Sequence, residues 1–196
     1  MSDSGQQRVR RLPPGPHGLP TELVERNQRE RLIAAMAEVC GERGYAECSV
    51  AEVARRAGVS TATFYGQFQD KRECVLVAFE ELFARLLEAL DGVCKGEGDA
   101  RDRARAGASI AANVLTADPL AGRLLAVEIL AVGPEGVRAH HGAIERLAER
   151  LRGGENAPTP DAVWACAAAM VAATARRLAA NEPPDASELQ ALAALL

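Results

Sequence analysis

The sequence has few of the residues from which catalytic centres are most often built. Of its 196 residues, three are histidine and 4% are aromatic. It contains neither the H-E-x-x-H pattern of zinc proteases nor the G-x-S-x-G pattern of serine hydrolases. The adjacent His140 and His141 would chelate a metal poorly, because neighbouring helical residues point about 100° apart. A pocket or surface role suits them better, and we expect no enzyme, no cofactor and no metal site.

Long apolar runs are missing as well. No stretch reaches the roughly 18 to 20 uninterrupted apolar residues that a membrane span needs. The N-terminus is basic but has no apolar segment behind it, unlike a secretory signal. Apolar residues make up 48% of the chain and charged residues 26%, which is ordinary for a globular protein. These features predict a cytoplasmic protein with no membrane partner.

The sequence also lacks cysteines spaced as pairs. The five cysteines form no C-x-x-C sequence, and their number is odd. In a chain without a secretory signal, this favours buried, reduced thiols that behave as small apolar side chains. A redox switch or a thiolate metal site remains the alternative. The cysteines are Cys40, Cys48, Cys74, Cys94 and Cys166.

Net positive charge is also lacking, since the chain carries a formal charge of −4. A binding surface for nucleic acid depends on the local field, however, and not on the total charge. Residues 1–20 hold Arg8, Arg10 and Arg11 together with four prolines, and this composition predicts a flexible arm. Such an arm either reaches the DNA minor groove or phosphates, or stays a solvated tail.

Helical patterns fill the rest of the chain, because Ala is abundant and strand-favouring residues are few. Thr21 can cap the first helix and Gly44 can end it. Asp118-Pro119 and Thr159-Pro160 are N-cap and first-turn pairs that start later helices. The patterns predict an all-α fold of about nine helices, at about 21–44, 49–57, 61–68, 70–90, 100–116, 119–132, 135–152, 160–180 and 186–196.

Two short helices joined by a glycine predict a helix-turn-helix. Ser49 to Glu52 form a capping box, and Ala54 is a small residue four positions before Gly58. The second short helix would lie in the major groove of DNA with its first side chains facing the base edges. The residues that it offers are Thr61, Ala62, Thr63, Tyr65, Gly66 and Gln67.

Residues 29–82 resemble the DNA-binding region of the tetracycline-repressor (TetR) family. The similar features are Gly44-Tyr45, Ala57-Gly58-Val59-Ser60, Phe64-Tyr65 with Phe68, and Asp70-Lys71. The resemblance implies a homodimer with a three-helix DNA-binding head and a body that binds a small-molecule effector. In that family the ligand usually releases the protein from operator DNA. The expected division is an arm at 1–20, a head at 21–70 and a body at 71–196.

The resemblance also implies which residues contact DNA. By position, Tyr65 and Lys71 would bind phosphates, and Ser49 would lie at the DNA surface. The residues nearest the bases would be Thr61, Ala62, Thr63 and Gln67. Gly66 departs from the family, which commonly has a bulky aromatic or basic side chain there, so one contact is missing.

The body offers candidates for two further sites. An apolar ligand would lie against Phe79, Leu82, Phe83, Leu86 and Trp164. The small residues of 160–180 and the apolar C-terminus favour a dimer interface through Ala165, Ala169, Ala172, Leu189 and Leu192. Two other functions stay open: a redox- or metal-sensing DNA-binding regulator, and a helical enzyme or scaffold with a vestigial head.

Overall fold

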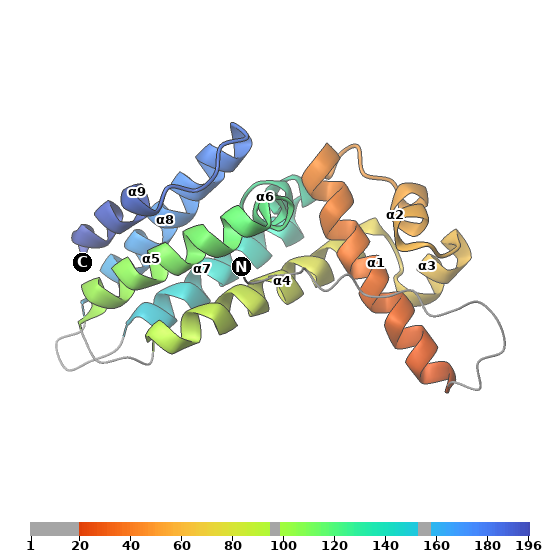
Figure 1. Ribbon diagram of the computed structural model, residues 1–196, viewed down its shortest axis with the longest axis horizontal. Coiled ribbons are helices and arrows are strands. Elements are labelled where there is room, and N and C mark those ends of the chain that lie inside the picture. The colour runs from red at the N-terminus through yellow and green to blue at the C-terminus, as the bar shows by residue number, and fades with distance from the viewer. Residues whose placement is uncertain (1–19, 95–98, 153–157) are drawn as a thin grey trace, which may run out of the picture.

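A computed structural model describes residues 20–94, 99–152 and 158–196. Within these ranges the chain is helical and has no strand, as predicted (Figure 1). Arg8, Arg10 and Arg11 lie outside the described residues, as does the side chain of Cys94. The α-helices in this part of the chain are α1 (Thr21–Arg43), α2 (Val50–Ala57), α3 (Thr61–Gln67), α4 (Lys71–Cys94), α5 (Ala100–Ala117), α6 (Pro119–Ala126), α7 (Pro134–Leu151), α8 (Pro160–Ala179) and α9 (Ala186–Leu192).

Most helix starts use the predicted caps. The side chains of Asp118 and Thr159 accept hydrogen bonds from the backbone N–H groups of Ala121 and Ala162. The first helix is an exception, since Thr21 is its first helical residue and Pro20 occupies the cap position without a side-chain bond. The expected helix at 119–132 is also divided. After α6 it tightens into a 3₁₀ helix, η1 (Glu128–Val132), and a second one, η2 (Ala193–Leu195), follows α9.

The helix-turn-helix is formed by α2 and α3. Ser49 Oγ accepts a hydrogen bond from the N–H of Glu52, but the Glu52 carboxylate pairs with Arg55 instead of completing the capping box. Gly58 adopts φ 65°, the left-handed conformation that glycine takes at little cost. Ser60 then caps α3 by accepting from the N–H of Thr63. These local bonds determine the angle at which α3 leaves the turn.

The head has its own core, which α1 crosses from end to end. Leu32 and Met36 of α1 are fully buried with Phe64 of α3. Arg31 donates to the backbone carbonyls of Ala57 and Gly58, so α1 also holds the turn of the helix-turn-helix. Figure 1 shows α2 and α3 beside α1, at the end of the molecule away from α8 and α9. The helix α3 therefore rests on α1.

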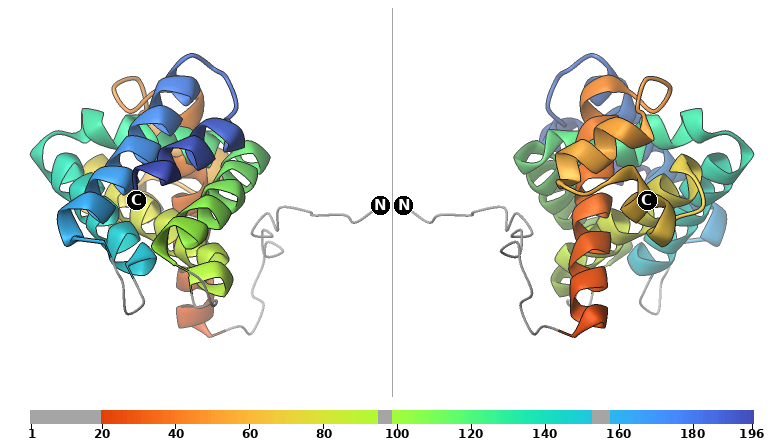
Figure 2. Two further views of the ribbon diagram at one scale, coloured as in Figure 1. Left: turned by 90° about the vertical axis from the view of Figure 1, so that its left-hand side faces the viewer. Right: turned by 90° about the vertical axis from the view of Figure 1, so that its right-hand side faces the viewer.

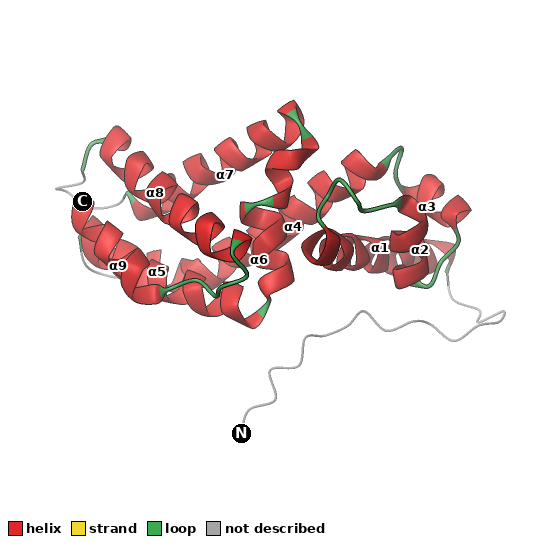
Figure 3. Ribbon diagram, turned by 90° about the horizontal axis from the view of Figure 1, so that it is seen from above, coloured by secondary structure: helices red, strands yellow, loops and turns green. Residues whose placement is uncertain are grey.

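The body consists of the helices α4 to α9, which pack side by side. In the two end views and the view from above, α7 lies against α8 and α5 against α9 (Figures 2 and 3). The helix α4 belongs to both parts, because Val75 packs in the head core and Leu90 in the body. From α6, Leu124 packs in the head core too. Both α4 and α6 thus connect the head to the body.

One helix of the body is unusually apolar. By length and composition alone, α8 is long and apolar enough to cross a membrane. Only 33% of its most apolar stretch of 18 residues is buried within the described chain. The rest of this helix is at least partly exposed, including Ala165 and Ala172.

Candidate DNA-binding surface and ligand cavity

The helix α3 presents a small, mostly neutral surface. Thr61, Ala62 and Gly66 are exposed, and Tyr65 is 60% exposed. On the opposite side of the helix, Phe64 is fully buried and contacts the Tyr65 ring edge to face at 5.5 Å. The buried Phe64 fixes the helix, and the exposed side chains are free to meet a partner.

The two ends of α3 are held by neighbouring side chains. At the start, the hydroxyls of Ser60 and Thr63 lie 2.9 Å apart, and Thr63 is partly buried. At the end, Arg29 donates to the backbone carbonyl of Gln67 at 2.8 Å while its guanidinium lies 4.3 Å from the centre of the Phe68 ring. These contacts reduce the motion of α3 and so lower the entropy that binding would cost.

Gly66 faces open space. A Cβ built at this position meets no atom within 4 Å. No packing within the described head therefore requires glycine here. The position leaves the helix backbone accessible where the family commonly has a large side chain.

Lys71 has a structural position that the sequence did not reveal. Its ammonium donates to the carbonyl oxygens of Tyr45 at 2.8 Å and Cys48 at 2.9 Å, and it lies 4.1 Å from the centre of the Tyr45 ring. The side chain thereby ties the start of α4 to the segment between α1 and α2. Ser49, which follows Cys48 in the sequence, is exposed.

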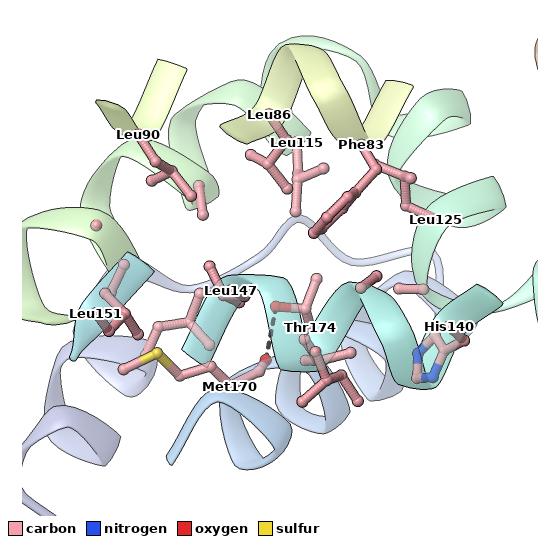
Figure 4. A pocket seen from close by; sticks show the side chains of 18 of the residues that line it. Phe83, Leu86, Leu90, Leu115, Leu125, His140, Leu147, Leu151, Met170 and Thr174 are labelled. Atoms are coloured by element: carbon pink, nitrogen blue, oxygen red, sulfur yellow. Dashed lines mark hydrogen bonds between the residues drawn. The ribbon is translucent and has the colours of Figure 1, made fainter. Parts of the chain in front are cut away.

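A cavity lies within the body. Together with the open solvent at its mouth it spans about 790 Å³. Phe79, Phe83 and Leu86 line it, as the α4 pattern led us to expect. Figure 4 shows Phe83 and Leu86 among the lining residues. Two expected residues do not: Leu82 packs against the head core, and the Trp164 ring contacts His141. The other lining residues are Leu90, Ala104, Gly107, Ala108, Ala111, Leu115, Leu125, Ala126, His140, Ala143, Ile144, Leu147, Leu151, Met170, Val171, Thr174 and Leu189.

Among the described residues that line the cavity, only His140 and Thr174 have polar side chains. The Thr174 hydroxyl donates to the carbonyl of Met170 at 2.9 Å. Burial, together with the neighbouring His141, lowers the pKa of His140, so its imidazole is neutral at pH 7. Among the described residues, Nε2 of His140 is buried without a hydrogen-bond partner. The helical spacing of His140, Ala143 and Leu147 already places the histidine on the apolar face of α7.

The expected dimer residues fall into two groups. Ala165 and Ala172 are exposed on α8, and Ala169 is partly exposed. Leu189 is 3% exposed and packs in the body core, and Leu192 is partly buried against the same core. The apolar character of Leu189 is therefore satisfied inside the chain and does not call for a partner.

The cysteines whose side chains the structure describes are free and buried: Cys40, Cys48, Cys74 and Cys166. The thiols of Cys40 and Cys48 interact with each other, which raises the pKa of Cys40 and lowers the pKa of Cys48. Both lie near the sulfur of Met36, at 3.5 and 3.8 Å. Within the described ranges, no three potential ligands gather to hold a metal.

The comparison with known families agrees with this architecture. A model of the bacterial regulatory proteins of the tetR family matches residues 32–78, which contain most of the head. Solved TetR-like regulators share the whole fold, head and body. The head of this chain is therefore similar to that of the TetR family.

Two curated proteins are similar to parts of this chain. A fatty acid metabolism regulator of Bacillus subtilis is 29% identical over 73 residues, which is 37% of this chain and 38% of that protein. The transcriptional activator FasR of Mycolicibacterium smegmatis is 28% identical over 106 residues, 54% of this chain and 48% of FasR. The chain thus spans less than half the length of the curated relatives it matches. Both relatives are named as regulators, and FasR as a transcriptional activator.

A solved structure shows the same fold with a ligand. The regulator FadR of Bacillus subtilis, in complex with stearoyl-CoA, has a TM-score of 0.65 and 18% identity, covering 85% of this chain and 96% of its own. At this identity the likeness shows the fold.

Proposed function

We propose that this chain is a cytoplasmic, dimeric transcription regulator whose affinity for operator DNA is set by a small apolar ligand in the cavity. One observation carries the proposal: α4 contacts both the DNA-binding head and the ligand cavity. It packs in the head core through Val75 and lines the cavity through Phe79, Phe83 and Leu86. A ligand that displaces this helix would also displace the recognition helix. The redox- or metal-sensing regulator and the helical enzyme or scaffold are the alternatives that this proposal replaces.

The DNA-binding role rests on the exposed side of α3. Thr61, Ala62, Thr63 and Gln67 would face base edges, where hydroxyl and methyl groups meet adenine and thymine. Tyr65 would hold a phosphate with its hydroxyl while its ring stays on Phe64. Ser49 would add a phosphate contact beside α3, and the arm with Arg8, Arg10 and Arg11 would add positive charge.

The ligand that we propose is a fatty-acyl compound. The cavity wall is apolar apart from His140 and Thr174, so it suits a hydrocarbon chain. The name of the Bacillus subtilis relative and the stearoyl-CoA of the FadR structure support the same class. We propose release from the operator on ligand binding, as in a repressor. An activator, which FasR is, would show tighter DNA binding with ligand instead.

The dimer that we propose uses the exposed apolar side of α8. Ala165, Ala169 and Ala172 are small, so a second helix can approach closely. An apolar helix with most of its apolar stretch outside the core is unfavourable in water. A second copy of the chain would cover it and present two recognition helices to a two-fold DNA site.

Fluorescence anisotropy with DNA from upstream of the protein's own gene tests the proposal. We expect specific binding that weakens steeply with salt, because phosphate contacts release counterions. Adding fatty acyl-CoA of increasing chain length should then change the affinity for this DNA but not for random DNA of equal length. Binding that is equally weak to both DNAs, or unaffected by every acyl compound, would contradict the proposal.

A further inference from the structure

The cavity is elongated along α7. His140 and Leu151 both line it, and their separation of eleven residues corresponds to about 16 Å along the helix. In Figure 4, His140 lies near Leu125, whereas Leu90 and Leu151 lie at the other side of the cavity. The space therefore suits an extended molecule, with one end beside an imidazole and the rest beside hydrocarbon.

His140 supplies a polar atom that the protein leaves unused. Its Nε2 is buried and has no hydrogen-bond partner in the described part of the chain. A buried polar atom without a partner is unfavourable, so a bound group that fills this valence gains affinity. Thr174 offers less, because its hydroxyl proton is already donated to the carbonyl of Met170.

The charge around His140 restricts the group that it can meet. The imidazole is neutral, since burial and His141 lower its pKa. No Lys or Arg of the described residues lines the cavity. An ionised carboxylate or phosphate at this end would be buried without a counter-charge, which is very costly.

We infer that the ligand is an extended apolar molecule with an uncharged hydroxyl or carbonyl group that hydrogen-bonds Nε2 of His140. This inference rests on the proposed role of the cavity as the effector site, and it narrows the class of effector. A simple hydrocarbon tail leaves His140 unpaired, and a charged head group has to remain outside the cavity.

Competition against a fluorescent apolar dye tests the inference on the full chain. The probes are dodecanol, chlorododecane and dodecanoate, which share a chain length but differ in the terminal group. We expect dodecanol to bind about three- to tenfold more tightly than chlorododecane, as one net hydrogen bond predicts, and dodecanoate to bind more weakly than dodecanol. His140→Phe should abolish the preference for dodecanol. The control His141→Phe, one position along on the exposed side, should keep it.

Imidazole nitrogen chemical shifts of the unaltered protein make the test independent of how His140→Phe folds. Dodecanol should shift the Nε2 signal of His140, and chlorododecane should not. Equal affinities for the two probes, no change at His140, or a preference that survives in His140→Phe would overturn the inference while leaving an apolar ligand site intact. If no probe displaces the dye, and filling the cavity with Ala108→Phe leaves dye binding unchanged, the proposed effector site itself fails.

Discussion

Among single residues, Lys71 shows how a side chain can have two interpretations. Its position in the TetR pattern implies a phosphate contact, but its ammonium donates to the carbonyls of Tyr45 and Cys48. Two of its three donors are thus used inside the head. The sequence could not reveal this, because those carbonyls lie 26 and 23 residues away and carry no side-chain signal.

Lys71→Met removes the charge and keeps the apolar stem. We expect the free energy of unfolding to fall by about 1–3 kcal/mol, the usual range for losing hydrogen bonds to a charged group. The salt dependence of DNA binding should stay nearly unchanged, because the ammonium is directed to the protein. Urea unfolding and salt titrations measure both quantities. Normal stability with a salt slope reduced by about one would instead make Lys71 a phosphate contact.

Tyr65 is the better candidate for phosphate binding. The residue is 60% exposed and is not part of the head core. Tyr65→Phe should leave thermal stability unchanged and weaken binding to all DNA sequences, by about 1.5–3 kcal/mol if the partner is a charged phosphate. Anisotropy with operator and random DNA measures this. A loss confined to one operator position would show that Tyr65 contacts a base.

Among the helices, α6 has a larger part than its short sequence indicates. Leu124 packs in the head core, and its neighbours Leu125 and Ala126 line the cavity. Gly41 of α1 lies against the α6 backbone, since a Cβ at this position would be 2.6 Å from the carbonyl oxygen of Leu120. Together with α4, α6 gives the cavity a second mechanical connection to the head.

Gly41→Ala tests the contact between α1 and α6. The added methyl group cannot fit without moving the helices apart, so we expect a loss of about 1–3 kcal/mol in stability. Gly142→Ala is the control, because a Cβ added at this position on α7 would meet no neighbouring atom within 4 Å. The control should match the wild type or gain up to about 1 kcal/mol from helix propensity. Calorimetric melting of the two variants decides, and equal melting temperatures would contradict the close approach.

The helix bounds were largely predictable, while the sites were only partly so. Caps such as Asp118 and Thr159 act within three residues, so the sequence shows them directly. The α4 side of the cavity followed from helical periodicity, as Phe79, Phe83 and Leu86 show. Leu82 and Trp164 do not line the cavity, because periodicity gives the apolar face of a helix but not which neighbour covers it.

At the scale of the whole molecule, the dimer is the first feature to test. Ala169→Arg or Ala172→Arg should give monomers, because either change puts a charge on the α8 face that we propose to be covered. DNA affinity should fall as well, since the paired heads are lost. Ala106→Arg, at an exposed position on α5, should stay dimeric. Sedimentation at matched concentrations distinguishes monomers from dimers. If all three variants stayed dimeric, the interface would lie on a face other than that of α8.

A series of polar contacts links the head to the body beside the cavity. The buried carboxylate of Glu128 accepts from the N–H of Tyr45 in the head at 2.9 Å and from Arg123 of α6 at 3.2 Å. Arg123 also donates to the side chain of Asn181, beyond α8, at 2.7 Å. Glu128 follows the cavity residues Leu125 and Ala126 within one turn. A ligand that moves α6 would therefore also displace Glu128 and, through it, the segment that follows α1.

This arrangement predicts reciprocal coupling between ligand and DNA. If acyl ligand weakens operator binding by some factor, operator must weaken ligand binding by the same factor, and about 1–3 kcal/mol is typical. Glu128→Gln should leave each site able to bind alone but reduce the factor, because the charged link to Arg123 is weakened. Glu145→Gln, at an exposed position of α7, is the control and should keep the factor. Calorimetry of ligand binding with and without operator measures it. Equal ligand affinity in both titrations of the wild type would mean that the cavity does not control the head, because no differential affinity would remain to shift the DNA equilibrium.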